Sequence, residues 1–554
     1  MRGVLVRSNR PLTFCALVVA GILTALLRKG RRGRSIGGRA RPSQPLSTRE
    51  AQPADQEAVI VETVSVRPHR PLALGVLVVA GVVAALLATG TPVPVLVTTV
   101  LVSTLVGVVA AATHPRLVCG LALAAFLVVL PLQLLVPALG RIDEILTLLA
   151  VIAAAIRVVS MRRIRFGSLV VAAAVFVLAQ GVSSALGGVG AAGFAASTFL
   201  FVKGPLLGWA FAQFDWDEAA LTRLFRGTEI VVWTLVAGLL AQAAFEPAWS
   251  SLLQRTLPPL RLGLPVATSY MPNPGDLAVL SAVAVAVVAA RACVVRLARR
   301  EIAVAAAAAL MLVATLRRKD LVAVAFALAV LLWWRRRSSR VPSGPRAPRR
   351  LLLFGGLVSA LLATPLAFAL VRYTWLEYLS GTRVVPRFLL YRDGVLLAVD
   401  HFPFGAGSGL FASHYSVIER SPLYERLGYD EVWGFNAEND SFLTDTFWPA
   451  VVGEGGVVAL LAYLGLVVLP FVWARRLLRT ADTSNRILAL ATIASGVVLL
   501  VNSLAAPTFA APPTAPLLFV LAGLCVSRLR GASSESVVRA GPRRATTEAR
   551  RARR

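Results

Sequence analysis

Long apolar stretches, separated by short polar segments, fill most of the 554-residue chain. A helix needs about 20 mostly apolar residues to cross a bilayer, and fifteen stretches reach or approach that length. They lie at 11–27, 72–88, 94–112, 117–139, 142–156, 167–186, 194–213, 228–245, 275–297, 302–316, 320–334, 351–372, 448–473, 487–506 and 514–529. Several are short or closely coupled, so the pattern predicts about 13–15 spans. The expected fold class is all-α, a polytopic transmembrane helical bundle with one large extracytoplasmic loop that contains short amphipathic helices.

The order of apolar and polar stretches divides the chain into five parts. These are an N-terminal extra span with a basic cytoplasmic linker (1–70), a transmembrane helical core (71–373), a large extracytoplasmic loop (374–446), C-terminal transmembrane helices (447–529) and a basic cytoplasmic tail (530–554). Residues 10–27 match residues 70–87 at 11 of 18 positions. The first span therefore either duplicates the second or resembles it only because both are apolar.

The composition excludes a soluble protein. Apolar residues make up 57% of the chain, charged residues 15%, and the mean hydropathy is +0.73. A soluble protein of this size carries far more charge. The formal net charge is +29, from 57 Lys and Arg against 28 Asp and Glu. Such a surplus can indicate nucleic-acid binding, so its distribution along the chain decides what it means.

Lysine and arginine follow the positive-inside rule. If residues 28–71 are cytoplasmic and the spans alternate, the cytoplasmic segments hold 41 of the 57 basic residues. This bias predicts a multi-pass protein with a cytoplasmic C-terminus, and the heavy use of Arg and Ala suggests a high-GC bacterial genome. We therefore expect the bacterial cytoplasmic membrane as the location. The basic flanks would then face anionic lipid. We therefore expect membrane lipids as partners and no nucleic acid.

The four cysteines provide no metal site or disulfide framework. Cys15, Cys119, Cys293 and Cys525 lie in or at the ends of apolar stretches, and none belongs to a CxxC pair. A disulfide-stapled or cysteine-ligated domain needs clustered cysteines. Neither class of protein fits this sequence.

The longest polar segment, 374–446, is the expected functional region. It holds ten of the 28 acidic residues with five arginines, and two of the four histidines, His401 and His414. Functional residues gather on loops that a rigid scaffold carries. Within this segment, residues 384–399 predict an amphipathic helix that lies along the membrane surface.

Charges at membrane depth are costly and are kept mainly where they pair or face a cavity. Lys203 lies inside an apolar stretch, so it either contacts an anion in the bundle or is a paired or snorkelling lysine. A second charged group separates two short apolar stretches and consists of Arg317, Arg318, Lys319 and Asp320. Alternation puts this basic turn outside, against the general trend. It is either a topological accident or a contact for a fixed anion, and guanidinium groups suit a diphosphate.

Residues 261–277 indicate a structured re-entrant turn before the next helix. They contain three prolines, with Asn273 between two of them. A helix that begins at Asp276 would point free N–H groups toward the turn, which favours an anion there. Alternatively, Asp276 is only an N-cap.

Two further groups in the large loop are candidates for chemistry. Three glycines give a backbone that can approach a ligand closely: Gly405, Gly407 and Gly409. No predicted strand precedes them, so they are not a nucleotide-binding fingerprint. Four polar residues gather before the next span: Glu438, Asn439, Asp440 and Asp445. They provide a general base and acceptors for sugar hydroxyls, or they belong to an ordinary solvated acidic loop.

These motifs, in this order, resemble the O-antigen ligase/O-antigen polymerase superfamily of bacterial membrane proteins. The matching segments are MPNPGD (271–276), TLRRKD (315–320), SGTR (380–383), DHFPFGAGSGLF (400–411), ENDSF (438–442) and VGEGGVVAL (452–460). Arg141-Ile142-Asp143 is similar to a polar pair that the family places at the outer start of an early span. The resemblance covers roughly 140–505.

The resemblance implies a metal-independent glycosyltransferase without a cofactor, acting on the outer face of the membrane. The donor would be an oligosaccharide on undecaprenyl diphosphate, with polysaccharide export and chain-length proteins as further partners. It implies that Arg317, Arg318, Arg261 and Arg383 bind the diphosphate and stabilise the leaving group. Glu438, Asn439 and His414 would be catalytic. Asp440, Asn273 and the three loop glycines would contact the glycan.

One difference from the family pattern bears on which of the family's two activities, polymerase or ligase, to expect. Ligases have a histidine before the asparagine, and this chain has Glu438. A glutamate can act as a base where desolvation raises its pKa, and His414 could replace the missing histidine in space. The departure favours a polymerase of repeat units over a ligase that transfers the glycan to another acceptor.

Two hypotheses that assign the chain to other classes of membrane protein remain open. A lipid-linked oligosaccharide flippase or other transporter would be expected to have polar groups along a path at mid-membrane and repeated halves. A different membrane glycosyltransferase would need an acidic metal site on an early outer loop, for which Asp143 and Glu144 are the only candidates.

Overall fold

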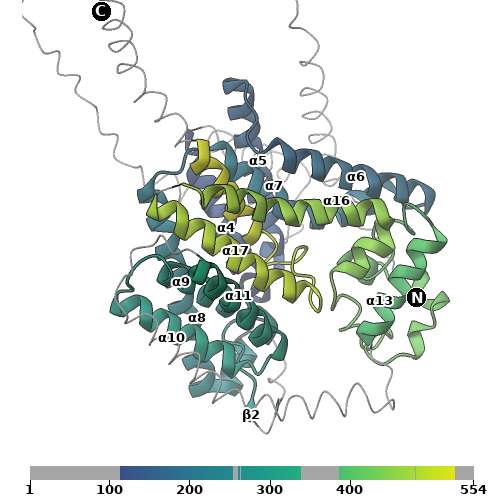
Figure 1. The fold of residues 1–554 in the computed structure, drawn as a ribbon. Coiled ribbons are helices and arrows are strands. Elements are labelled where there is room, and N and C mark those ends of the chain that lie inside the picture. Colours follow the sequence, from purple (N-terminus) through teal and green to yellow (C-terminus); the bar gives the residue numbers. More distant parts are fainter. Residues whose placement is uncertain are drawn as a thin grey trace, which may run out of the picture. The chain divides into compact units, whose positions relative to one another are not determined.

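The structure is a computed structural model that describes residues 113–135, 137–253, 260–261, 264–337, 386–480 and 482–530 (Figure 1). All of them belong to Val79–Arg554, the second of two units into which the chain divides. Several predicted features lie outside the described residues: the spans at 11–27, 72–88, 94–112 and 351–372, the N-terminal repeat, the basic linker, the start of the large loop and nearly all of the basic tail. These remain predictions.

Among the described residues the regular secondary structure is helical, apart from one pair of two-residue strands. The helices are α4 (Pro115–Leu135), η1 (Pro137–Arg141), α5 (Ile142–Met161), α6 (Gly167–Leu186), α7 (Ala191–Gln213), α8 (Glu218–Leu252), α9 (Pro274–Ala292), α10 (Arg299–Ala314), α11 (Arg318–Arg337), α13 (Pro386–Asp400), α14 (His414–Ile418), α15 (Leu423–Arg426), η3 (Tyr429–Glu431), α16 (Trp448–Leu477), α17 (Thr483–Ser503) and a final helix at 517–530. Strands β1 (Leu260–Arg261) and β2 (Leu264–Pro265) pair antiparallel.

Seven helices are long and apolar enough to cross a membrane. They are Leu139–Met161, Gly167–Leu186, Ala191–Gln213, Glu218–Ser251, Pro274–Ala292, Trp448–Leu477 and Thr483–Ser503. The prediction of a multi-pass helical membrane protein is confirmed at this level. The larger span count is not reached within the described residues, because some apolar stretches form shorter helices. The stretch at 302–316 corresponds to α10, of 16 residues, and α11 carries charges at both ends.

Helix ends follow the local sequence. The Asp217 side chain accepts a hydrogen bond from a backbone N–H in the first turn of α8, and Asp482 does the same for α17. Helix α9 begins at Pro274, directly after Asn273, two residues earlier than the sequence predicted. Proline has no N–H to leave unpaired in a first turn, so this start is favourable.

Small residues let α7 and the final helix approach closely. A Cβ on Gly204, Gly208 or Gly523 would collide with the backbone of the facing segment. Membrane helices lack a strong hydrophobic drive to associate, so close backbone packing at small residues stabilises their contacts.

The helices pack in two groups that α16 and α17 connect. In one group α6 lies along α16, and α5 lies between α4 and α7. In the other, α9 packs on α10, α11 and α17. Helix α13 lies on α16, on the side where the large loop folds (Figure 1). The helix predicted at 384–399 is therefore present, and its outward face carries apolar side chains, including Phe388, Val395 and Val399.

Candidate functional site

The basic turn between α10 and α11 meets the start of α9. The Arg317 guanidinium lies over Gly275, so close that a Cβ built on Gly275 would stand 2.9 Å from one of its nitrogens. Nε of Arg317 and Oδ2 of Asp276 are both buried and have no hydrogen-bond partner among the described residues. Two segments that the sequence singled out separately therefore form one site, and glycine at 275 leaves room for the guanidinium.

The turn that precedes α9 is held by α8. Oε1 of Gln242 accepts hydrogen bonds from the backbone N–H groups of Thr268 (2.9 Å) and Ser269 (2.8 Å). The backbone of Ala267 donates to the carbonyl of Ala314, at 3.2 Å. The structure thus contains the structured turn that the prolines indicated, and it exposes Asn273 at its end.

Lys319 and Asp320 fix the basic turn to the end of α17. Nζ of Lys319 donates to the carbonyl of Ala505 at 2.6 Å. The side-chain amide of Asn502 donates to Asp320, whose carboxylate is completely buried. These two residues therefore have a positional part in the site, beside Arg317.

The large loop closes over this turn with charged residues of its own. Nε of Arg387, in the first turn of α13, donates to Asp445 at 2.8 Å. The charges of Arg387 and Asp445 both act on Lys319. The Tyr391 hydroxyl donates to the carbonyl of Leu504 at 2.9 Å, at the same end of α17. Arg317, Lys319 and Arg387 thus form a group of cations, named here the basic cluster.

The glycine-rich segment 405–413 is bound to a break in α16. Gly456 interrupts that helix with a φ of +68°, a conformation that glycine adopts readily. The carbonyl oxygens of Gly453 and Glu454 accept hydrogen bonds from the backbone of this segment, at 2.9 and 3.0 Å. The loop therefore replaces part of the hydrogen bonding that the helix interior loses.

The three loop glycines approach the protein itself. A Cβ on Gly405 would stand 2.6 Å from the Gly456 nitrogen, and one on Gly407 would stand 2.9 Å from Val189. A Cβ on Gly409 would stand 2.7 Å from the Tyr415 ring. The close approach for which we expected a ligand is thus made to α16 and to neighbouring side chains.

The carboxylate of Glu454 organises the same segment. It is completely buried and accepts hydrogen bonds from the backbone N–H groups of Gly409 and Phe411, the latter at 3.2 Å. The hydroxyls of Ser413 and Ser197 donate to it as well, the latter at 3.3 Å. Backbone N–H groups can only donate, so this surrounding suits a carboxylate.

A second charged site lies at the start of α5. Nζ of Lys203 is 2.9 Å from Oδ2 of Asp143 and 3.9 Å from Oε1 of Glu144, and the Lys203 and Asp143 side chains are 3% and 2% exposed. The ammonium also lies 5.3 Å from the centre of the Phe126 ring. Of the two interpretations of Lys203, the paired lysine agrees with the structure.

His414 stands near this buried ion pair. It begins α14, which packs on α7. The His414 side chain is exposed at the surface, but the protein on its other side removes part of its hydration and lowers the pKa of its imidazole below the usual value, and the positive charge of Lys203 lowers it further. His414 is therefore suited to accept a proton at neutral pH.

The other predicted catalytic residues lie on the water-exposed part of the loop. Glu438 and Asp440 are exposed, and Glu438 has no ion-pair or hydrogen-bond partner for its side chain among the residues described. Oδ1 of Asn439 accepts a hydrogen bond from the Ser441 hydroxyl at 2.7 Å. Glu438 is thus outside the desolvated surrounding that would help a glutamate to act as a base.

The remaining predicted diphosphate ligands are only partly described. Arg318 is half-buried at the first position of α11, next to Arg317. Arg261 lies in β1, and the description covers its backbone only. Arg383 lies outside the described residues. In the part of the chain that the structure describes, no group of three or more His, Cys, Asp or Glu side chains could hold a metal ion.

Two residues of the site, Glu454 and Arg387, were not among the predicted site residues. Glu454 lies near the start of the apolar stretch 448–473, within the segment VGEGGVVAL, and a carboxylate at such a position is a signal in itself. Arg387 and Asp445 are 58 residues apart and gave no local signal for their pairing.

No protein-family model matches the chain, and a search of curated proteins finds no match.

Proposed function

We propose that this chain is an O-antigen-polymerase-like membrane glycosyltransferase. It joins oligosaccharide repeat units carried on undecaprenyl diphosphate, at the outer face of the cytoplasmic membrane. The observation that carries this proposal is the meeting of four segments: the turn before α9, the basic turn before α11, the first turn of α13 and the end of the large loop.

The basic cluster has the chemistry that a diphosphate leaving group requires. Arg317 presents a planar, permanently charged fork of the kind that binds phosphate oxygens in pairs, and Arg387, which Asp445 holds, adds positive charge beside it. Nε of Arg317 is already desolvated and lacks a partner among the described residues, so a bound anion would gain a strong hydrogen bond there. Fixed cations of this kind stabilise the negative charge that develops when the sugar leaves the diphosphate.

His414 is the residue best suited to accept the proton of the attacking hydroxyl. Its imidazole has a lowered pKa. In the chain, His414 directly follows segment 405–413, which the Glu454 carboxylate holds. Transfer breaks the bond between the sugar and the diphosphate, forms a glycosidic bond to the acceptor hydroxyl and releases one proton, which the imidazole takes. Glu438 remains the alternative base if substrate binding buries it.

The lipid-linked glycans of a strain without this protein test the proposal. A polymerase predicts single repeat units on the carrier, exposed on the outer face. Long polymer that stays on the carrier would mean a ligase, and single units on the cytoplasmic leaflet would mean a flippase.

Returning variants to that strain tests the site. We expect Arg317→Ala to insert in the membrane at normal levels and to restore no polymer, because the diphosphate loses its desolvated contact. Arg299→Ala, an exposed arginine at the start of α10, is the matched control and should restore polymer fully. Full activity of Arg317→Ala would overturn the assignment of the basic cluster.

A further inference from the structure

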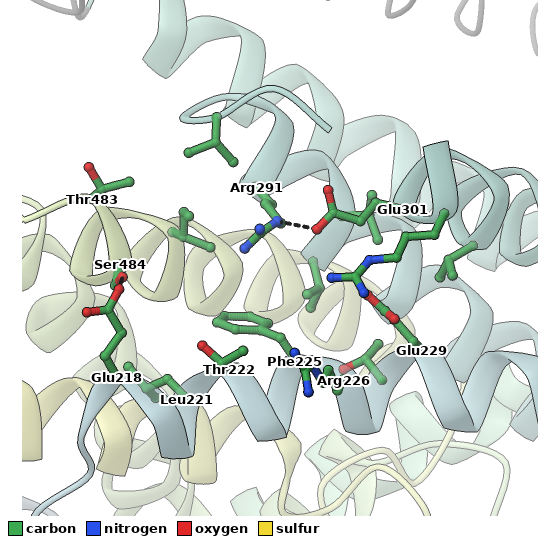
Figure 2. Close-up of a pocket in the computed structure, with 17 residues that line it drawn as sticks. Glu218, Leu221, Thr222, Phe225, Arg226, Glu229, Arg291, Glu301, Thr483 and Ser484 are labelled. Atoms are coloured by element: carbon green, nitrogen blue, oxygen red, sulfur yellow. Dashed lines mark hydrogen bonds and ion pairs between the residues drawn. The ribbon is translucent and has the colours of Figure 1, made fainter. Parts of the chain in front are cut away.

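A pocket opens between α8, α9, α10 and α17 at the ends of these helices that are far from the basic cluster. Its volume is about 270 Å³. Figure 2 shows the side chains that line it, from the first turns of α8 and α17, the last turn of α9 and the first turn of α10. The positive-inside pattern puts these helix ends on the cytoplasmic side. The pocket is thus separate from the proposed glycosyl-transfer site.

The pocket has an apolar wall and a charged rim. The wall consists of Leu221, Phe225, Val287, Val288, Val295, Val304 and Ile487. The charged residues of the lining are three arginines and three glutamates: Arg226, Arg291, Arg300, Glu218, Glu229 and Glu301. Such a combination at a helix end suits a molecule with an apolar part and a charged part, and the balance of charges suits a zwitterion rather than a simple anion.

Half of the charged rim is already occupied by contacts within the protein. Nε of Arg291 lies 2.7 Å from Oε1 of Glu301 (Figure 2). The Ser484 hydroxyl donates to Glu218 at 2.9 Å. The other three charges, Arg226, Arg300 and Glu229, have no ion-pair partner among the described residues. Two cations and one anion are therefore available to a ligand.

We propose that this pocket binds the phosphoethanolamine headgroup of a membrane phospholipid. The phosphate contacts Arg226 and Arg300, whose guanidinium forks fit phosphate oxygens, and the ammonium contacts Glu229. The acyl chains follow the apolar wall toward the bilayer. Ligand pockets for larger molecules span about 300–1,000 Å³, so this volume suits a headgroup better than a glycan. Basic pockets between membrane helices are known to hold lipid headgroups.

Native mass spectrometry of the full-length protein in detergent tests this proposal. Phosphatidylethanolamine and phosphatidylglycerol with the same acyl chains are added in equal amounts. We expect one phosphatidylethanolamine to bind in preference. Arg226→Gln/Arg300→Gln should weaken its binding at least about tenfold, because two hydrogen bonds to charged groups are lost.

Two further variants separate the contacts. Arg223→Gln/Arg299→Gln changes exposed arginines of the same two helices that do not line the pocket, and it should change binding by less than about twofold. Glu229→Gln should abolish the preference for phosphatidylethanolamine, because the ammonium loses its partner.

Three results with the intact lipids would overturn the proposal. These are equal lipid binding by the wild type and Arg226→Gln/Arg300→Gln, a preference of the wild type for phosphatidylglycerol, and an unchanged preference in Glu229→Gln. Soluble glycerophosphoethanolamine should bind far more weakly than the intact lipid. Equal affinity would mean that a soluble phosphate compound, and no lipid, occupies the pocket.

Discussion

Replacing Glu454 with glutamine tests how the large loop is attached to the membrane helices. The carboxylate accepts hydrogen bonds from Gly409, Phe411, Ser413 and Ser197. In Glu454→Gln one acceptor oxygen becomes an NH₂ group, which cannot accept from a backbone N–H. About two of the four hydrogen bonds are lost.

The size of the effect follows from those contacts. A hydrogen bond to a charged group contributes about 1.5–3 kcal/mol, and removal of a buried charge offsets part of the loss. We expect the attachment of segment 405–413 to weaken by about 2–4 kcal/mol. The equilibrium constant for local opening would rise roughly 30- to 900-fold.

Amide hydrogen exchange of the full-length protein in lipid nanodiscs measures this opening. Exchange should accelerate in peptides that cover 405–413 and stay unchanged in α9, which has no contact with Glu454. Glu425→Gln changes an exposed carboxylate of the same loop and should leave exchange within about twofold of the wild type. Equal exchange in Glu454→Gln and Glu425→Gln would refute the idea that this carboxylate holds the loop.

Two further predictions concern the buried ion pair and the histidine beside it. Lys203→Met should lower the free energy of unfolding by about 3–5 kcal/mol, because Asp143 keeps a buried charge without its cation; Lys203→Met/Asp143→Leu should recover most of this loss in thermal unfolding. A double variant no more stable than the single one would contradict that reasoning. The His414 imidazole should titrate below its usual value of about 6.5, and Lys203→Met should raise the midpoint, because a nearby positive charge disfavours protonation. The pH dependence of modification by diethyl pyrocarbonate measures this, with His414→Gln identifying the signal, and a midpoint that does not move would exclude Lys203 as a cause.

The sequence predicted some local features of the site well. The turn before α9 was expected from its prolines, and the helix at the start of the large loop from its apolar pattern; both are present. Helix propensity and capping depend on residues that are close in sequence, so these two features could be predicted from the sequence alone. Helix α9 begins at Pro274, two residues before its predicted start, because proline is favourable at the first position of a helix.

Other features depended on contacts that no local pattern encodes. The loop glycines were expected to approach a ligand, and they approach Gly456, Val189 and Tyr415. Glu438 belonged to a recognisable motif, yet it lies exposed to water. Burial and proximity depend on how distant segments pack, so the role of a polar side chain could not be assigned from its neighbours in sequence.

The sequence by itself determined that this is a helical membrane protein, because hydrocarbon admits only helices or closed barrels and the apolar stretches have the length of helical spans. It also indicated which charged side chains need a compensating partner because they lie within apolar stretches, and Lys203 is one of them. Only the tertiary structure decided the partners of those charges: Lys203 with Asp143, and Arg317 over Gly275. The free-energy cost of burying a charge can be inferred from the position of one residue in the sequence. The partner that offsets this cost is distant in the sequence, so only the folded structure identifies it.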